Sequence, residues 1–167
     1  MKLGIEMETK QKVAIKILKK LDDRAKTDLE IEIHALKRVK GSPYILELID
    51  HGKGKMTDKN GKTKEVFFFA LEYASGGEFF DYVVECAKFN QKLTRYYFHQ
   101  LLFGLKHCHK NRVYHRDIKM ENLILDSNYN LKIIDFGLAA VLKDDESEKM
   151  SQKIGTKGYQ PPEVLAK

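Results

Sequence analysis

The most constraining feature of the sequence is a polar segment that lies between apolar runs. Residues 114–122 read YHRDIKMEN, and the triplet DFG follows at 135–137. These two stretches concentrate carboxylates, cations and an amide in a short length of chain. Phosphoryl transfer needs a carboxylate that takes or orients a hydroxyl proton, a cation for the phosphoryl group, and oxygen ligands for Mg²⁺. The pattern therefore predicts a site for that chemistry.

Four side chains of these stretches have separate roles in the prediction. Asp117 is the candidate for the hydroxyl proton. Lys119 lies two residues further along an extended loop, so it points to the same side as Asp117 and can meet the phosphoryl group. Asn122 and Asp135 offer the hard oxygen ligands that Mg²⁺ prefers, and the short strands between them can bring both to one ion.

A second motif lies upstream, where Val13-Ala14-Ile15-Lys16 alternates in the manner of a strand. Alternation places Ala14 and Lys16 on the same face. The small side chain of Ala14 leaves room for a flat ring, and Lys16 can reach a phosphate beside it. This face is suited to a nucleotide.

Taken in order, these motifs and the downstream run Pro161-Pro162-Glu163 resemble the catalytic core of eukaryotic protein kinases. The ordered set is very specific, since unrelated loops would reproduce it with a probability below roughly one in a hundred. The resemblance implies an α+β fold of the protein-kinase type with two lobes. One is a small lobe with an antiparallel sheet and one helix, and the other is mainly helical. It also implies ATP and Mg²⁺ as cofactors.

The resemblance assigns a set of residues to the nucleotide. Lys16 would hold the α- and β-phosphates, and Leu71 would be the gatekeeper behind the adenine. The backbone of Glu72 and Ala74 would provide hydrogen-bond partners for the adenine, and Asp135 would reach the metal together with Asn122. The full cofactor-binding set is Ala14, Lys16, Glu32, Leu71, Glu72, Ala74, Ile124 and Asp135.

The partner of Lys16 is expected on a helix at residues 27–39, where apolar residues recur at helical spacing. Glu30 and Glu32 are the candidates. Glu32 lies one turn before Leu36 on the inward face of the helix, whereas Glu30 points away from Leu36. Glu32 is therefore the predicted partner, and Glu30 is expected to be solvated.

Hydrophobic patterning predicts the other elements around this site. Strands are expected at residues 2–5, 13–18, 44–49, 66–71, 123–125 and 131–134. Helices are expected at residues 27–39, from about residue 78, and at 93–111. The turn signal at 59–62 predicts a lengthened hairpin between the third and fourth strands.

Two positions follow the pattern of serine/threonine kinases. They are Lys119 and Thr156, and tyrosine kinases usually differ at both. Thr156 is expected to hydrogen-bond near Asp117 and Lys119, so the catalytic set is Asp117, Lys119, Asn122 and Thr156. The runs at 72–78 and 135–140 are most similar to the calmodulin-dependent and AMP-activated kinase group.

Four further residues are assigned to regulation and substrate choice. In the resembling family a cation such as Arg116 is commonly neutralised by a phosphate on the activation segment, and Ser151 is the predicted site. Glu78 and Glu121 are predicted to face the substrate, because acids at these positions in the resembling group meet an arginine upstream of the target residue. Glu78 could instead favour the start of its own helix. The predicted partner is a protein with basic residues near its target Ser or Thr.

Composition narrows the remaining classes of partner. Hydrophobic residues make up 43% of the 167 residues, and no apolar run approaches the roughly 20 needed to cross a bilayer, so no membrane association is expected. The net charge is +6, but the densest lysines, at 53–64, have no aromatics between them, which disfavours nucleic acid. Cys86 and Cys108 are expected to be reduced thiols, and the expected location is the cytoplasm or the nucleus.

The resemblance also predicts how the chain is divided. Residues 1–71 would be the N-terminal lobe without its glycine-rich loop, 72–77 the hinge, and 78–167 a C-terminal lobe that ends after the activation segment. The chain is therefore expected to be a kinase catalytic domain truncated at both ends. The alternative is a catalytically inactive kinase-like chain that acts only by binding. All the motif residues of the site are present, which argues against a decayed site.

Overall fold

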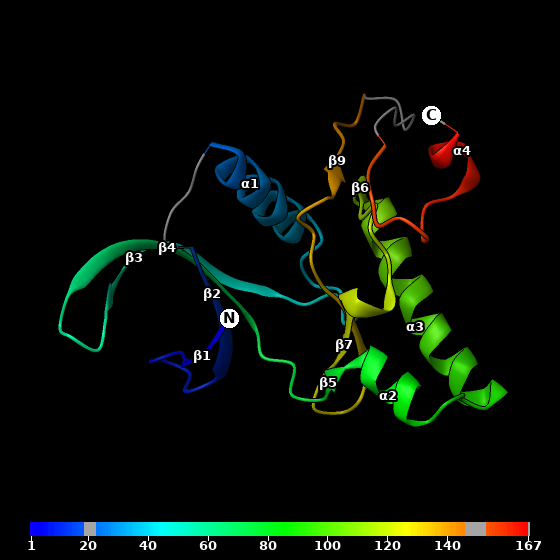
Figure 1. Ribbon diagram of the computed structural model, residues 1–167, viewed down its shortest axis with the longest axis horizontal. Helices are drawn as coiled ribbons and strands as arrows, with labels where there is room; N and C mark the ends of the chain where they lie inside the picture. The colour runs from blue at the N-terminus through cyan, green and yellow to red at the C-terminus, as the bar shows by residue number, and fades with distance from the viewer. Residues whose placement is uncertain (19–22, 146–152, 167) are drawn as a thin grey trace.

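The computed structural model describes residues 1–18, 23–145 and 153–166 (Figure 1). The first part of the chain forms an antiparallel sheet in the order β1-β2-β4-β3. Its strands are β1 (Lys2–Ile5), β2 (Lys12–Leu18), β3 (Leu48–Thr57) and β4 (Thr63–Glu72). Helix α1 (Asp23–Arg38) lies beside this sheet and contacts β3. The expected small lobe, an antiparallel sheet with one helix, is present.

The second part of the chain combines helices with short strands. The helices are α2 (Phe79–Glu85), α3 (Gln91–Lys110), the single-turn 3₁₀ helix η1 (Met120–Asn122) and α4 (Pro162–Leu165). The strands are β5 (Gly77–Glu78), β6 (Val113–Tyr114), β7 (Leu123–Leu125), β8 (Leu131–Ile133) and β9 (Ala140–Val141), arranged as sheets β5-β7-β8 and β6-β9. Figure 1 shows α3 on the opposite side of the molecule from the β3–β4 hairpin.

The long helix α3 begins and ends where its sequence provides caps. The side chain of Asn90 accepts a hydrogen bond from the backbone N–H of Leu93 at 2.8 Å, which satisfies one of the unpaired donors of the first turn. His107, His109 and Lys110 lie in the last turn, where positive charge is favourable. Within the described residues, no helix is both long enough and apolar enough to span a membrane.

The predicted strand at 44–49 is wrong for residues 44–47, whereas Leu48 and Ile49 belong to β3. Residues 44–46 run along β8, where Leu46 N donates to Ile133 O at 3.0 Å and Ile133 N donates to Tyr44 O at 2.9 Å, and only Glu47 O accepts from β4, from Glu72 N at 2.9 Å. Ile45 and Leu46 are buried, at 3% and 4% exposure. The apolar pattern therefore correctly marked a buried segment, but the partner is in the second part of the chain.

The strand β3 instead begins at Leu48 and continues to Thr57, so the predicted lengthened hairpin is confirmed. Its turn is held by Asp58, whose side chain accepts hydrogen bonds from the backbone N–H groups of Asn60 and Lys62. Gly61 adopts a φ of 76°, which glycine tolerates without strain. Helix α1 begins at Asp23, four residues before the predicted start at residue 27.

One continuous apolar core joins the two parts of the molecule. It runs from Leu36 of α1 and Phe69 of β4 to Cys108 of α3 and Phe136. Gly104 allows α3 to approach closely, because a Cβ there would lie 2.7 Å from Ile133 Cδ1 and 3.3 Å from the carbonyl oxygen of Tyr44. The same glycine therefore fixes the helix against both β8 and the 44–47 segment.

Candidate active site

A cavity of about 610 Å³ lies between the first sheet and the β5-β7-β8 sheet. The eight residues predicted to bind the cofactor all line it, and Glu78 does as well. These residues are Ala14, Lys16, Glu32, Leu71, Glu72, Ala74, Ile124 and Asp135. Leu46 and Ile134 add to its apolar lining. Segments that lie far apart in the sequence thus converge on one space.

The wall formed by β2 and β4 pairs a small residue with a large apolar one. Ala14 lies directly opposite Leu71 in the antiparallel register, and Lys16 lies opposite Phe69. The ammonium of Lys16 lies 4.9 Å from the centroid of the Phe69 ring. This wall is apolar near Leu71 and cationic at Lys16, which suits a molecule with a flat apolar part and an anionic part.

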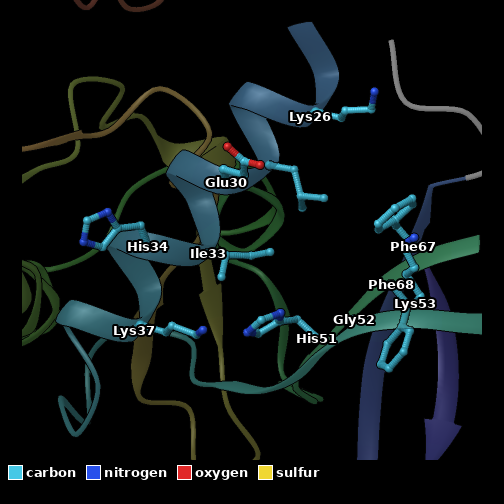
Figure 2. A pocket seen from close by; sticks show the side chains of 11 residues that line it. Lys26, Glu30, Ile33, His34, Lys37, His51, Gly52, Lys53, Phe67 and Phe68 are labelled. Atoms are coloured by element: carbon cyan, nitrogen blue, oxygen red, sulfur yellow. The ribbon is translucent and has the colours of Figure 1, made fainter. Parts of the chain in front are cut away.

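Lys16 is held in place by Glu32 of α1. Its Nζ lies 3.0 Å from Glu32 Oε2, and Glu32 is only 6% exposed. Burial raises the pKa of Glu32, and the charge and hydrogen bond of Lys16 act in the opposite direction. Glu30 lies on the other side of the helix, in the groove drawn in Figure 2. The structure therefore pairs Lys16 with the glutamate that helix geometry predicts.

Asp117 is the centre of a compact polar network. Its Oδ1 accepts hydrogen bonds from the backbone N–H of Thr156 at 2.7 Å and from the Thr156 hydroxyl at 2.6 Å. Its Oδ2 lies 2.9 Å from Lys119 Nζ, which also donates to the Thr156 hydroxyl at 2.8 Å. Asn122 donates its amide N–H to Asp117 Oδ2 at 3.2 Å. All four predicted catalytic residues are in contact within this network.

The network also sets the charge states of its members. Burial alone would raise the pKa of Asp117, but hydrogen bonds from Thr156 and Lys119 outweigh burial and hold the pKa below its usual value. The hydrogen bond to Asp117 raises the pKa of Lys119. Near neutral pH the site therefore contains a carboxylate beside an ammonium.

Gly155 allows Thr156 to reach Asp117. Its φ is 110°, and a Cβ at this position would lie 2.6 Å from the carbonyl oxygen of Arg116. Only glycine combines that backbone conformation with so close an approach. The side chain of Gln160 donates to the carbonyl of Gly155 at 2.9 Å, which ties the turn to the segment that follows.

Asn122 and Asp135 fit the role of oxygen ligands for Mg²⁺. The amide nitrogen of Asn122 donates to the Asp117 carbonyl at 2.8 Å, so its amide oxygen is the atom left for a metal. Asp135 is exposed to the cavity and has a φ of 63°. Magnesium usually takes one or two protein ligands and completes its shell with phosphate oxygens and water. Asp135 lines the cavity, and the carbonyl of Asn122 accepts a hydrogen bond from the backbone N–H of Ile134 at 3.0 Å, so the two candidates lie on neighbouring segments.

The two substrate candidates lie in different surroundings. Glu78 is exposed, lines the cavity and precedes α2 without any side-chain hydrogen bond to that helix. Glu78 is nevertheless the N-cap residue of α2, where a carboxylate is favourable, so both its predicted role toward the substrate and the alternative stay predictions. Glu121 is exposed in η1, and the Tyr159 hydroxyl approaches its Oε2 at 3.4 Å. Glu121 thus faces the segment after Thr156.

Arg116 connects the catalytic loop to the residues after the DFG triplet. Its Nε donates to Leu138 O at 2.8 Å, and its Nη2 donates to Ala139 O at 3.2 Å. Burial lowers the pKa of its guanidinium. Ser151 lies outside the described residues, so its assignment as the regulatory hydroxyl stays a prediction.

His115 was not assigned a role from the sequence, although it orders the site. It is 2% exposed, its Nε2 lies 2.9 Å from Ile134 O, and its Nδ1 accepts from Asp117 N at 3.3 Å. Its ring packs edge-on against Phe136, with the centroids 4.7 Å apart. Burial lowers the pKa of His115. A neutral imidazole with Nε2 protonated satisfies both hydrogen bonds.

Lys132 is the second residue that the sequence pattern provides no reason to select. Its Nζ lies 2.8 Å from Glu72 Oε1 and 2.9 Å from Glu72 Oε2, and it is 8% exposed. Glu72 Oε2 also accepts from the backbone N–H of Glu47 at 3.3 Å. The pair joins the end of β4, which lines the cavity, to β8. A lysine in an alternating strand predicts exposure, so only the structure identifies this contact.

Comparison with known proteins agrees with this geometry. The protein kinase domain family matches residues 1–167. The chain is 36% identical to CBL-interacting protein kinase 11 of Oryza sativa subsp. japonica, over 96% of the chain and 31% of the relative. It is 37% identical to SNF1-related protein kinase catalytic subunit alpha KIN12 of Arabidopsis thaliana, over 99% of the chain and 32% of the relative.

A third relative, the probable serine/threonine-protein kinase MARK-B of Dictyostelium discoideum, is 39% identical over 98% of the chain and 22% of its own length. The chain therefore spans a third or less of the length of these relatives. The match to the family nevertheless covers every residue of the chain. This chain belongs to the protein kinase domain family.

Proposed function

We propose that this chain catalyses the transfer of a phosphoryl group from Mg-ATP to a serine or threonine hydroxyl of a protein. The observation that carries the proposal is the network of Asp117, Lys119 and Thr156. It holds a carboxylate with a lowered pKa next to a cation, in the same loop region as the metal-ligand candidates. Family membership and the serine/threonine kinases among the relatives support the same activity.

Each residue has a definable task in this reaction. Bound Mg-ATP supplies the phosphoryl group and a metal charge that offsets negative charge during transfer. Lys16, fixed by Glu32, positions the phosphates, and Asp117 orients the substrate hydroxyl and accepts its proton. Lys119 provides positive charge beside Asp117, where negative charge develops during the transfer.

Substrate choice follows from the residues around this network. Thr156 and Lys119 form hydrogen bonds with each other and with Asp117. A lysine and a threonine at these two positions are the pattern of serine/threonine kinases in the resembling family. Glu78 and Glu121 add two exposed carboxylates. A guanidinium suits such carboxylates, so we propose a preference for Arg three residues before the target Ser or Thr.

The activity is tested by comparing Lys16→Met with Lys12→Met in the same strand. Lys12 is exposed and outside the cavity lining, so it controls for loss of one lysine from β2. With radiolabelled ATP and a serine peptide, Lys16→Met should lower transfer by about 10²-fold or more, while Lys12→Met should stay near the wild-type rate. Equal rates for the two variants would reject the proposed role of Lys16, and wild-type protein without any transfer would favour a chain that acts only by binding.

The substrate preference is tested with two peptides that carry Arg or Ala three residues before the serine. A charge-assisted contact contributes about 1.5 to 3 kcal/mol, so the Arg peptide should react roughly 10- to 100-fold faster at low concentration. Glu121→Gln should reduce that ratio, whereas Glu65→Gln, in an exposed position on the β3–β4 hairpin, should not. Equal rates on both peptides would refute the preference while leaving the phosphoryl-transfer proposal intact.

A further inference from the structure

The segment at 72–78, which contributes to the wall of the active-site cavity, is anchored at both of its ends. At the first end, Glu72 pairs with Lys132 of β8. At the second end, Gly77 and Glu78 form β5, which pairs with β7 and lies beside α2 (Figure 1). The two anchors involve different partners, so one end can be loosened without the other.

The second end is built on two adjacent glycines. The backbone N–H of Gly76 donates to Leu125 O at 2.9 Å. A Cβ on Gly76 would lie 2.5 Å from the carbonyl oxygen of Asp126, so the chain packs directly on the end of β7. Gly77 has a φ of 87°, in the region that glycine adopts readily. Glycine loses more backbone freedom on folding than any other residue, so this pair depends on outside contacts to stay in place.

Tyr82 supplies such a contact. Its hydroxyl donates to the carbonyl of Gly76 at 2.6 Å, at the short end of the range for such hydrogen bonds. Tyr82 lies in α2, about one turn after Glu78, which is the N-cap of that helix. The Tyr82 ring packs edge-on against Tyr129 of the β7–β8 turn, with the centroids 6.2 Å apart. The hydrogen bond therefore joins the chain before Glu78 to the helix after it.

This arrangement makes the location of the Glu78 carboxylate depend on Tyr82. Of the described residues that line the cavity, Glu78 is one and Tyr82 is not. The carboxylate makes no capping hydrogen bond to α2, so the backbone at 76–78 determines where it lies. We propose that Tyr82 is a positioning residue, whose hydroxyl holds Gly76 and thereby keeps the carboxylate of Glu78 at the edge of the cavity, where it meets a substrate arginine. The link to substrate rests on the proposed function.

The inference is tested with Tyr82→Phe, which keeps the ring and removes the hydroxyl. Tyr96→Phe is the matched control, because the Tyr96 hydroxyl donates to Asn130 Oδ1 at 3.1 Å and so joins α3 to the same turn. For a serine peptide with Arg three residues before the serine, Tyr82→Phe should raise KM by about 3- to 10-fold. Its kcat and its KM for ATP should stay within about twofold of wild type, since the anchor at Glu72 is intact. Tyr96→Phe should leave all three within about twofold.

A second measurement asks whether Tyr82 acts through Glu78. In a Glu78→Gln background, Tyr82→Phe should cause no further rise in the KM for the Arg peptide, because the carboxylate that Tyr82 positions is already gone. A further rise of threefold or more would overturn the inference. A parallel loss of kcat and of ATP affinity in Tyr82→Phe would also overturn it, since that result describes a general structural role.

A third measurement does not require phosphoryl transfer. Hydrogen exchange at the Gly76 amide should be about tenfold faster in Tyr82→Phe than in wild type and unchanged in Tyr96→Phe. Equal exchange in the two variants would overturn the inference. If wild-type protein shows no transfer, the proposed function fails, but the affinity for a fluorescent Arg peptide still tests Tyr82. A lower affinity in Tyr82→Phe alone would support the inference, and equal affinities in both variants would overturn it.

Discussion

Removing the carboxylate of Glu72 should destabilise the protein more than removing the ammonium of its partner Lys132. The side chain of Lys132 is 10% exposed and that of Glu72 is 29% exposed, so the lysine depends more on the pair for its solvation. In Glu72→Gln, the nearly buried ammonium of Lys132 keeps only the amide oxygen of the new glutamine as its partner. Breaking a buried pair in this way typically costs about 3 to 5 kcal/mol, and partial exposure of Glu72 favours a value of about 3 kcal/mol.

Lys132→Met has a smaller expected cost. The remaining carboxylate of Glu72 is partly hydrated and still accepts a hydrogen bond from Glu47 N, and a methionine can fill the space of the lysine stem. We expect a loss of about 1 kcal/mol. The double variant should lose less stability than the sum of the two single variants, by about 1 to 3 kcal/mol. The reason is that the loss in Glu72→Gln comes from the uncompensated charge of Lys132, which the double variant no longer carries.

The assay is equilibrium unfolding in urea, followed by circular dichroism, with the free energy of unfolding extrapolated to water. Lys40→Met is the matched control, because the Lys40–Glu47 pair lies nearby but is exposed, with 66% and 45% of the side chains accessible and an N–O distance of 3.4 Å. It should change stability by less than about 0.5 kcal/mol. A loss of stability in Lys132→Met that equals or exceeds that in Glu72→Gln would show that Lys132 does not depend on Glu72 for its solvation, and so would strict additivity of the two losses.

Three further outcomes test the packing and the charge states. Ellman's reagent should titrate one thiol in the native protein and two in denaturant, because Cys86 is exposed whereas burial raises the pKa of Cys108 to about 12. Gly104→Val should cost at least about 1 to 3 kcal/mol in urea unfolding through overpacking, and a stability equal to wild type would contradict the close approach of α3. The lowered pKa of Asp117 contributes stability that is present above the usual pKa and is lost as pH falls through the lowered one. Thr156→Val removes one of the hydrogen bonds that lower the pKa of Asp117, so acid unfolding should begin at a higher pH. An unchanged midpoint of acid unfolding would show that this hydrogen bond does not lower that pKa.

The elements with strong periodicity could be predicted from the sequence. The strands at 2–5 and 123–125 agree with β1 and β7, and α3 differs from its predicted bounds by two residues at the start and one at the end. The alternation of β2 and the position of Glu32 relative to Leu36 also predicted which side chains face the cavity. These features depend on local geometry, which the order of residues determines.

Features that depend on distant partners could not be predicted in the same way. The segment 44–47 has the apolar pattern of a strand, but the backbone hydrogen bonds of Tyr44 and Leu46 go to Ile133 of β8, almost ninety residues further along the chain. Lys132 lies between two apolar residues of a short strand, where the alternating pattern predicts a surface residue. Only the approach of Glu72 explains its burial. The groove between α1 and the first sheet was missed because its lining comes from three segments, at 26–37, 51–53 and 67–68, that the sequence separates.

The most direct test of the account compares transfer with nucleotide binding in Asp117→Asn. The oxygen of Asn can still accept the hydrogen bonds of Thr156, so the loop should keep its shape while the proton acceptor is lost. We expect transfer of radiolabelled phosphate to a serine peptide to fall by about 10²- to 10⁴-fold, with the affinity for a fluorescent ATP analogue changed by less than about threefold. Transfer at a rate comparable to wild type would contradict the assignment of Asp117 as the residue that acts on the hydroxyl.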